Sequence, residues 1–137
     1  MSQSEVQAGI AAGMRAGGFS EPRYVALEND DPFDACMIDG GTSTDTDPSP
    51  KDIALLSGEL KRQGWVQEDY WAEEGMTLLY MRRGAWTVTF MGGTLTKEEV
   101  AERLPEDERA AAQKIKGLRV AAVDRACQNR VYKSLYP

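Results

Sequence analysis

Five carboxylates between residues 28 and 39 are the side chains with the clearest capacity to hold a metal ion. They are Glu28, Asp30, Asp31, Asp34 and Asp39, and Mg²⁺ and Ca²⁺ prefer oxygen ligands of this kind. An EF-hand loop that starts at Asp30 would need glycine at its sixth position and glutamate at its twelfth, where this chain has Ala35 and Gly41. The spacing therefore favours a solvated acidic loop, and we expect no metal site there.

Two glycine pairs could hold a phosphate group on their backbone N–H groups. Each pair follows a strand-like segment and precedes a threonine: Gly40, Gly41 and Thr42, and Gly92, Gly93 and Thr94. Neither pair lies in a GxxxxGK[ST] or GxGxxG pattern, and such a pair is more often a tight exit from a strand. We expect turns without a bound phosphate.

Histidine does not occur in the sequence, which removes the side chain most used for acid–base catalysis near neutral pH. Ser-His-Asp, Cys-His and HExxH mechanisms are thereby excluded. The two cysteines, Cys36 and Cys127, lie far apart and form no CxxC motif, so we expect buried free thiols. Because no other catalytic motif is present, we expect a protein that is not an enzyme and holds no cofactor.

Aromatic side chains are concentrated between residues 65 and 90. They are Trp65, Tyr70, Trp71, Tyr80, Trp86 and Phe90. In a regular strand Val66 and Tyr70 lie on one side and Trp71 on the other, so at least one large ring reaches the outer face of a sheet. Exposed aromatic rings are typical of protein interfaces. We expect Trp65, Tyr70, Trp71 and Tyr80 to form an interaction surface; the alternative is that small side chains and the 40–50 loop cover them.

The charges are divided unevenly along the chain. Residues 1–108 hold nine cations and 21 anions, whereas residues 109–137 hold seven cations and one anion. The seven cations are Arg109, Lys114, Lys116, Arg119, Arg125, Arg130 and Lys133. A segment of one sign either docks on a surface of opposite charge or meets a charged partner from outside. We expect these residues to be interaction residues.

Several partners fit this basic segment. Docking on the acidic body, in the same or a neighbouring subunit, uses both halves of the charge division, and we expect it first. Nucleic acid is the alternative, with a log–log salt slope of about −6 if all seven cations meet phosphates. An acidic protein or a merely solvated helix also remains open. The acidic body could itself mimic nucleic acid and inhibit an enzyme that handles DNA or RNA.

Local patterns predict two helices in the first half of the chain. Ser4 and Gln7 form a capping-box pattern ahead of apolar residues at four-residue steps, which predicts a helix over 5–16. Its many glycines and alanines favour a packed or interfacial helix. A second helix is predicted over 50–63, with Ser49 as its N-cap.

Strand-like runs surround these helices. Two are predicted at 23–28 and 35–39, around the acidic loop, and residues 40–50 are rich in turn formers and predict a mobile loop. A three-stranded meander is predicted at 66–72, 76–82 and 85–91.

The last third is predicted to be helical. A capping-box pattern opens a short helix over 96–103, and the basic segment over 105–135 has apolar residues spaced along one helical stripe. Gly117 weakens that helix, and residues 118–123 could form a strand instead.

Together these patterns predict one α+β domain over residues 1–137. We expect two layers, with an antiparallel sheet of four or five strands packed against the 50–63 helix and the C-terminal helical segment. No apolar run approaches the about 18 residues of a membrane span, and the first residues lack a signal-peptide pattern, so we expect a cytoplasmic protein.

The absence of catalytic motifs, the aromatic meander and the charge division favour a non-catalytic protein-interaction module. It would act as an assembly component, adaptor or inhibitor that binds a protein partner or forms a homo-oligomer. A nucleic-acid-binding regulatory protein remains the alternative.

Overall fold

The computed structural model describes residues 1–25, 31–73, 75–95 and 115–137 of the chain. Within these ranges the chain forms a six-stranded antiparallel sheet and three α-helices, which confirms the predicted α+β class with more strands than the expected four or five. The elements in chain order are α1 (Gln3–Ala16), β1 (Arg23–Tyr24), the 3₁₀ turn η1 (Asp34–Cys36), β2 (Met37–Ser43), α2 (Pro50–Arg62), β3 (Val66–Glu73), β4 (Met76–Arg83), β5 (Trp86–Leu95), β6 (Ile115–Asp124) and α5 (Arg125–Leu135). The helix predicted over 96–103 and residues 105–114 of the predicted 105–135 helical segment lie outside the described residues.

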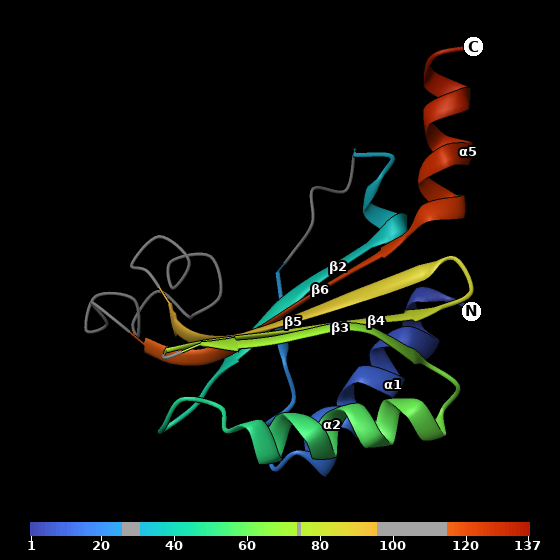
Figure 1. The fold of residues 1–137 in the computed structure, drawn as a ribbon. Coiled ribbons are helices and arrows are strands. Elements are labelled where there is room, and N and C mark those ends of the chain that lie inside the picture. The colour runs from blue at the N-terminus through green and yellow to red at the C-terminus, as the bar shows by residue number, and fades with distance from the viewer. Residues whose placement is uncertain (26–30, 74, 96–114) are drawn as a thin grey trace.

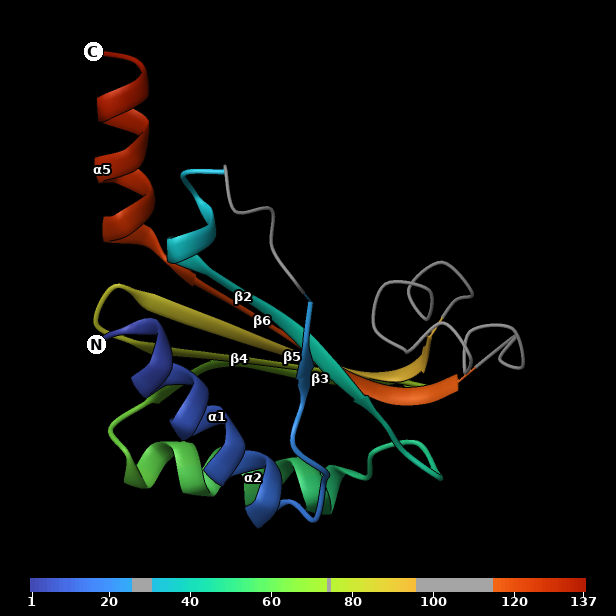
Figure 2. The same cartoon turned by 180° about the vertical axis from the view of Figure 1, so that it is seen from behind.

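The strand order across the sheet is β1-β2-β6-β5-β4-β3, with antiparallel neighbours throughout. β3, β4 and β5 form the predicted meander at one side of the sheet. Helices α1 and α2 lie against one face, and α5 rises on the side of the opposite face (Figures 1 and 2). The predicted two-layer packing therefore holds for α2 but not for the C-terminal helix, which stands outside the helical layer.

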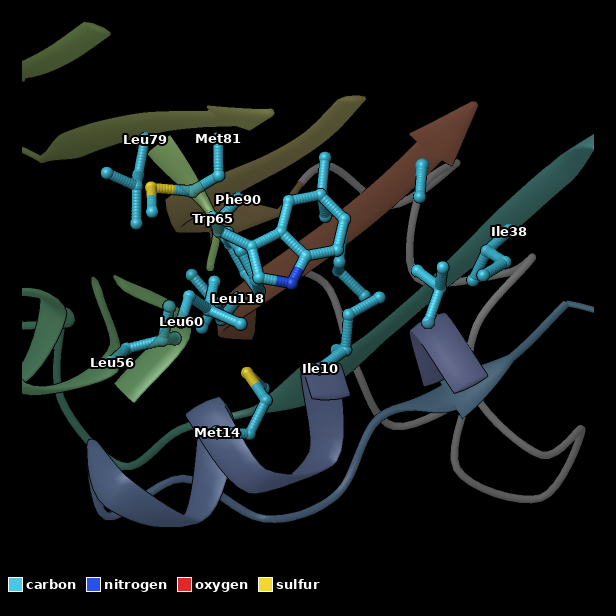
Figure 3. Packing of buried hydrophobic residues seen from close by; sticks show 14 of the residues in the cluster. Ile10, Met14, Ile38, Leu56, Leu60, Trp65, Leu79, Met81, Phe90 and Leu118 are labelled. Atoms are coloured by element: carbon cyan, nitrogen blue, oxygen red, sulfur yellow. The ribbon is translucent and has the colours of Figure 1, made fainter. Parts of the chain in front are cut away.

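The core lies between the sheet and the pair α1 and α2 (Figure 3). Its largest buried side chains come from both helices and from the inner strands β4, β5 and β6: Val6, Ile10, Met14, Ile53, Leu56, Leu60, Leu79, Met81, Val88, Phe90 and Leu118. Trp65 and Trp86 are buried with them, each 3% exposed. Trp86 is also held by a hydrogen bond, since its Nε1 donates to the Met1 carbonyl at 2.9 Å. Residues far apart in the sequence thus share one apolar interior.

Small residues let α1 approach α2 closely. A Cβ added at Gly9 would lie 2.5 Å from Gln63 Oε1, and one at Gly13 would lie 3.3 Å from Leu60 Cγ. The Gln63 side-chain amide also donates to the Gly9 carbonyl at 3.3 Å. The prediction of a packed first helix is confirmed.

The two helix starts differ in how well they follow the sequence pattern. The α2 start is confirmed, because Ser49 Oγ accepts a hydrogen bond from the Asp52 N–H at 3.1 Å. The α1 start is not: the capping box is formed by Ser2 and Glu5, not by residues 4 and 7. The pKa of the Glu5 carboxyl is lowered chiefly by the hydrogen bond from the Ser2 N–H and, to a smaller extent, by the interaction with the Ser2 hydroxyl. The pattern of serine followed three residues later by a carboxylate or amide occurs twice within the first seven residues, and the earlier pair forms the cap.

Replacing Ser2 by alanine is expected to lower the free energy of unfolding by about 1 kcal/mol, because the Glu5 N–H loses its acceptor. Ser4→Ala is the matched control: Ser4 is exposed in the first turn of α1, where alanine is the better helix former. Urea unfolding at neutral pH measures both variants. A loss at Ser4 with none at Ser2 would contradict the observed helix start.

Two segments were assigned to the wrong element by their local sequence. Residues 40–43, predicted as part of a mobile loop, belong to β2 and pair with β6. The strand β6 occupies residues 115–124, so the predicted 105–135 helix is wrong over this range, and the strand alternative for 118–123 is confirmed. Both errors have one cause: β2 and β6 pair across about 80 residues of sequence, and non-local pairing outweighs weak local propensity.

Candidate interaction surface

The sheet face opposite α1 and α2 carries large apolar side chains that none of the described helices covers. The register places Trp71, Leu78 and Met91 in one row across β3, β4 and β5, on the face opposite the buried Leu79 and Phe90. We call this surface the open face and define it by Val66, Trp71, Met76, Leu78, Tyr80 and Met91. Its exposed members range from Trp71 at 39% to Val66 at 56%.

A β-bulge in β3 decides which rings reach the open face. The register shifts between Gln67 and Asp69, and the extra residue reverses the alternation along the strand. Val66 and Trp71 therefore share the open face, whereas Tyr70 lies on the side of α2. The prediction that Val66 and Tyr70 share a side is wrong for this reason.

The four aromatic residues predicted as interaction residues have three different placements. Trp71 and Tyr80 are diagonal neighbours on the open face. Tyr70 is 38% exposed at the edge beside α2. Trp65 is buried in the core, so it does not contribute to any surface. Two of the four predicted residues thus lie on the open face, and their role in binding stays a prediction.

Strand β3 forms one edge of the sheet, and all eight of its residues are exposed. It carries Glu68, Asp69 and Glu73, and the ion pair of Glu68 with Arg82 ties it to β4. Charges and a bulge on an edge strand disfavour pairing with a further strand. The edge is therefore protected, and the apolar contact area lies on the open face beside it.

Two cations of the basic segment pair with carboxylates of the acidic body. Arg119 Nε lies 3.5 Å from Asp39 Oδ1 on the neighbouring strand, and Lys116 Nζ lies 3.9 Å from Asp47 Oδ2. Arg109 and Lys114 lie outside the described residues. The remaining three cations, Arg125, Arg130 and Lys133, are on α5, and within the described ranges none of them forms an ion pair.

Helix α5 has one apolar side and one basic side. Val131 and Leu135, and Tyr132 and Tyr136, lie four residues apart and share the first side, whereas Arg130 and Lys133 lie on the second. Exposure is high, at 58% for Tyr132, 46% for Leu135 and 65% for Tyr136. The two tyrosine rings contact each other with centroids 4.9 Å apart. No α5 side chain is buried, and no described helix is long and apolar enough to cross a membrane.

A disulfide between Cys36 and Cys127 holds the base of α5 against η1. The two Cα atoms lie 5.4 Å apart, although 91 positions separate the residues in the sequence. The prediction of free thiols is therefore wrong. Spacing could not reveal the bond, because β2 and β6 must first pair before the ends of both strands bring the cysteines together.

Glu28 and Asp30 lie outside the described residues, so the structure does not test whether they take part in a metal site. Asp31 is exposed, and Asp34 and Asp39 are half-buried. No group of three or more potential ligands in the described part of the chain could hold a metal ion.

Both glycine pairs lie within strands and not in turns after them. Gly40 and Gly41 belong to β2, and Gly92 and Gly93 belong to β5. Gly40 allows the close approach of β1, since a Cβ there would lie 2.7 Å from the Arg23 carbonyl oxygen. Their backbone groups are used in strand pairing, so these glycines do not form a phosphate-binding turn.

A small groove separates α2 from β3. It has a volume of about 250 Å³ and is lined by Ile53, Ser57, Tyr70 and Leu79 among others. Its polar pair is already satisfied, because Ser57 Oγ donates to Gln67 Oε1 at 2.8 Å. The groove is smaller than the about 300 Å³ at which small-molecule sites usually begin. Two larger hollows, of about 530 Å³ beside Asp31 and about 440 Å³ beside Asp45, are lined largely by polar residues, whereas ligand sites are mostly apolar. We therefore take the open face as the candidate surface.

Sequence reasoning missed two sets of surface residues. Met76, Leu78 and Met91 accompany Trp71 and Tyr80, and the alternation within 76–82 was the signal for the first two. The apolar side of α5 was missed because the predicted helix had its apolar stripe further toward the N-terminus. Comparison with protein-family models, curated proteins and solved structures gives no match for this chain.

Proposed function

We propose that this chain is a non-catalytic protein-interaction module and that the open face is its binding surface. One observation carries the proposal: helices cover one face of a six-stranded sheet, while the other face presents Trp71 and Tyr80 without a described cover. Exposed apolar patches of this kind mark protein interfaces, and burying one large apolar side chain contributes about 2 kcal/mol.

The partner is expected to cover the open face, not to extend the sheet. The acidic residues and the bulge of β3 disfavour a further strand at that edge. The open face offers rings and thioethers, and Met91 and Met76 can adapt to the shape of a partner. An apolar partner surface with cations at its rim complements this face and the acids beside it.

The disulfide also bears on where the module acts. Such bonds persist in oxidising compartments and are rare in the cytosol. The Cys36–Cys127 bond therefore favours an oxidising compartment over the cytoplasm expected from the sequence.

Nucleic-acid binding through the basic segment has less support. Lys116 and Arg119 are paired with carboxylates of the body, so α5 offers three cations within the described ranges. Three phosphate contacts correspond to a log–log salt slope of about −3. The acidic body behind them repels a polyanion.

Replacing Trp71 and Tyr80 together by serine is expected to weaken partner binding at least about tenfold, since interface aromatics often contribute about 2 kcal/mol or more each. Immobilised wild-type and variant chains are compared for capture of proteins from the native host and of a differently tagged copy of the chain. Leu55→Ser is the matched control, because Leu55 is 49% exposed on α2, away from the open face.

All side chains changed in this experiment are substantially exposed, so far-UV circular dichroism should show folded proteins. Binding that is lost from the double variant and kept by Leu55→Ser supports the proposal. Equal capture by the wild type and the double variant would exclude the open face as the binding surface.

A further inference from the structure

Two apolar surfaces of this chain lack a described partner: the open face and the apolar side of α5. One is a sheet face without a helix, and the other is a helix without a surface beneath it. We propose that a second copy of the chain joins them, so that α5 of each copy lies on the open face of the other in a two-fold symmetric dimer. This inference rests on the proposed function, because it names the partner of the same surface.

The base of α5 is fixed in a way that keeps the helix off its own sheet. The Asp124 carboxylate accepts a hydrogen bond from the Cys127 N–H at 3.0 Å, and the Arg125 N–H donates to the Ala85 carbonyl at 2.9 Å. The disulfide to Cys36 adds a covalent tie in the first turn. From this base the helix axis leads away from the body (Figures 1 and 2). The apolar side of α5 is therefore available to another molecule.

The dimensions of the two surfaces agree. An 11-residue helix is about 16 Å long, and strands lie about 4.8 Å apart, so α5 spans three to four strands. The apolar row of the open face, Trp71, Leu78 and Met91, extends over three strands. An apolar sheet face is buried against another layer of secondary structure, and a helix is one such layer.

The charges of the two surfaces are also complementary. Arg130 and Lys133 lie on the basic side of α5, with Lys133 three residues before Tyr136 at the border of the apolar side, and they form no ion pair within the described ranges. Asp69 and Glu73 lie exposed at the β3 edge of the open face. When the apolar side of α5 faces Trp71 and its row, Lys133 lies at the flank of the contact, from which its long side chain extends toward that acidic rim. This arrangement is the docking on the acidic body of a neighbouring subunit that the charge division predicts.

Two-fold symmetry makes the exchange reciprocal. Each copy donates one helix and receives one, so the same contact forms twice and the assembly closes at two copies. A single helix contact is small compared with the about 1,200 Å² buried in a stable interface, and the second contact doubles it.

Light scattering after size-exclusion chromatography of the oxidised full-length chain tests the proposal. The expected mass is twice the 15.1 kDa of one chain at concentrations up to about 200 µM. Tyr132→Ser with Leu135→Ser removes the apolar side of α5, and Trp71→Ser with Tyr80→Ser removes the centre of the open face. Each double variant is expected to raise the dissociation constant at least about tenfold. Ser134→Ala on α5 and Leu55→Ser on α2 are controls that leave the dimer intact.

Mixing the two double variants gives the decisive result. Neither variant alone retains an intact helix–sheet contact, but a heterodimer retains one: the intact α5 of the open-face variant lies on the intact open face of the α5 variant. Differently tagged chains should therefore associate in the mixture more strongly than either variant with itself. Far-UV circular dichroism confirms folding of each variant.

Three outcomes overturn the proposal. A wild-type monomer at the highest concentration excludes the second copy, while capture of another protein that depends on Trp71 and Tyr80 would leave the proposed function standing. If the dimer survives the α5 substitutions but not the open-face substitutions, the open face forms the dimer without α5, and the exchange of helices is excluded. Absence of the heterodimer in a mixture of folded variants excludes the reciprocal contact.

Discussion

Replacing Cys36 and Cys127 together by alanine is expected to lower the free energy of unfolding by about 2 to 5 kcal/mol. The bond closes a loop that contains most of the chain, since 91 positions separate the two cysteines. Closing so long a loop restricts the unfolded ensemble strongly, and the chain-entropy estimate for about 100 residues is about 4.7 kcal/mol. A typical domain has only about 5 to 15 kcal/mol in total, so the effect is large.

Guanidinium unfolding with and without reductant measures this effect. The wild type should lose stability on reduction, and the double variant should give one unfolding curve under both conditions. A thiol assay in denaturant should find no free thiol in the oxidised wild type. Two free thiols, or a reductant-insensitive wild type, would contradict the disulfide and remove the argument for an oxidising compartment.

The loss should also have a local component. The disulfide connects η1 with the first turn of α5, whereas the core strands β5 and β6 are held by their own pairing. Hydrogen exchange of α5 amides should therefore accelerate in the double variant at denaturant concentrations where β5 is still protected. Equal acceleration in β5 would show that the bond stabilises only the whole fold.

The parts of the fold that the sequence predicts are those with strong local signals. Ser49 and Pro50 specify the start of α2 by capping and by a fixed φ, and neither depends on the rest of the chain. The meander was predictable because its strands follow one another with short turns and pair with their sequence neighbours.

The parts that were missed depend on contacts distant in sequence. Gly40 and Gly41 resemble a loop locally, yet they occupy β2 because β1 and β6 pair on either side of it. Residues 118–123 have helix-compatible spacing, and only their position between β2 and β5 makes them a strand.

The candidate surface was predicted only in part, because the direction of some side chains also depends on contacts distant in sequence. Trp71 and Tyr80 are large rings in alternating strands, a pattern that the sequence displays directly. Trp65 has the same residue type and lies in the core, and the β3 bulge that redirects Tyr70 has no clear sequence signal. Sequence patterns therefore do not predict the direction of side chains at strand ends and bulges.

Replacing Phe90 by alanine is expected to lower the free energy of unfolding by about 3 to 5 kcal/mol. Phe90 is 1% exposed at the centre of β5, where it points toward α1 and α2 (Figure 3). Removing its ring leaves a cavity beside its cross-strand neighbours Leu79 and Val120, and a close-packed interior relaxes only partly around such a void. This loss is a large fraction of the free energy of unfolding of a typical domain.

Met91→Ala is the matched control, because Met91 is the next residue of β5 and lies on the open face. Its side chain is half-buried, and we expect a loss of less than about 1 kcal/mol at protein concentrations near 1 µM. Urea unfolding measures both variants under these conditions. A cost at Met91 similar to that at Phe90 would mean that the same chain covers the open face, which would contradict its availability to a partner. If a second copy covers this face, the cost at Met91 should instead increase with protein concentration, because dimer formation then stabilises the wild type more than the variant.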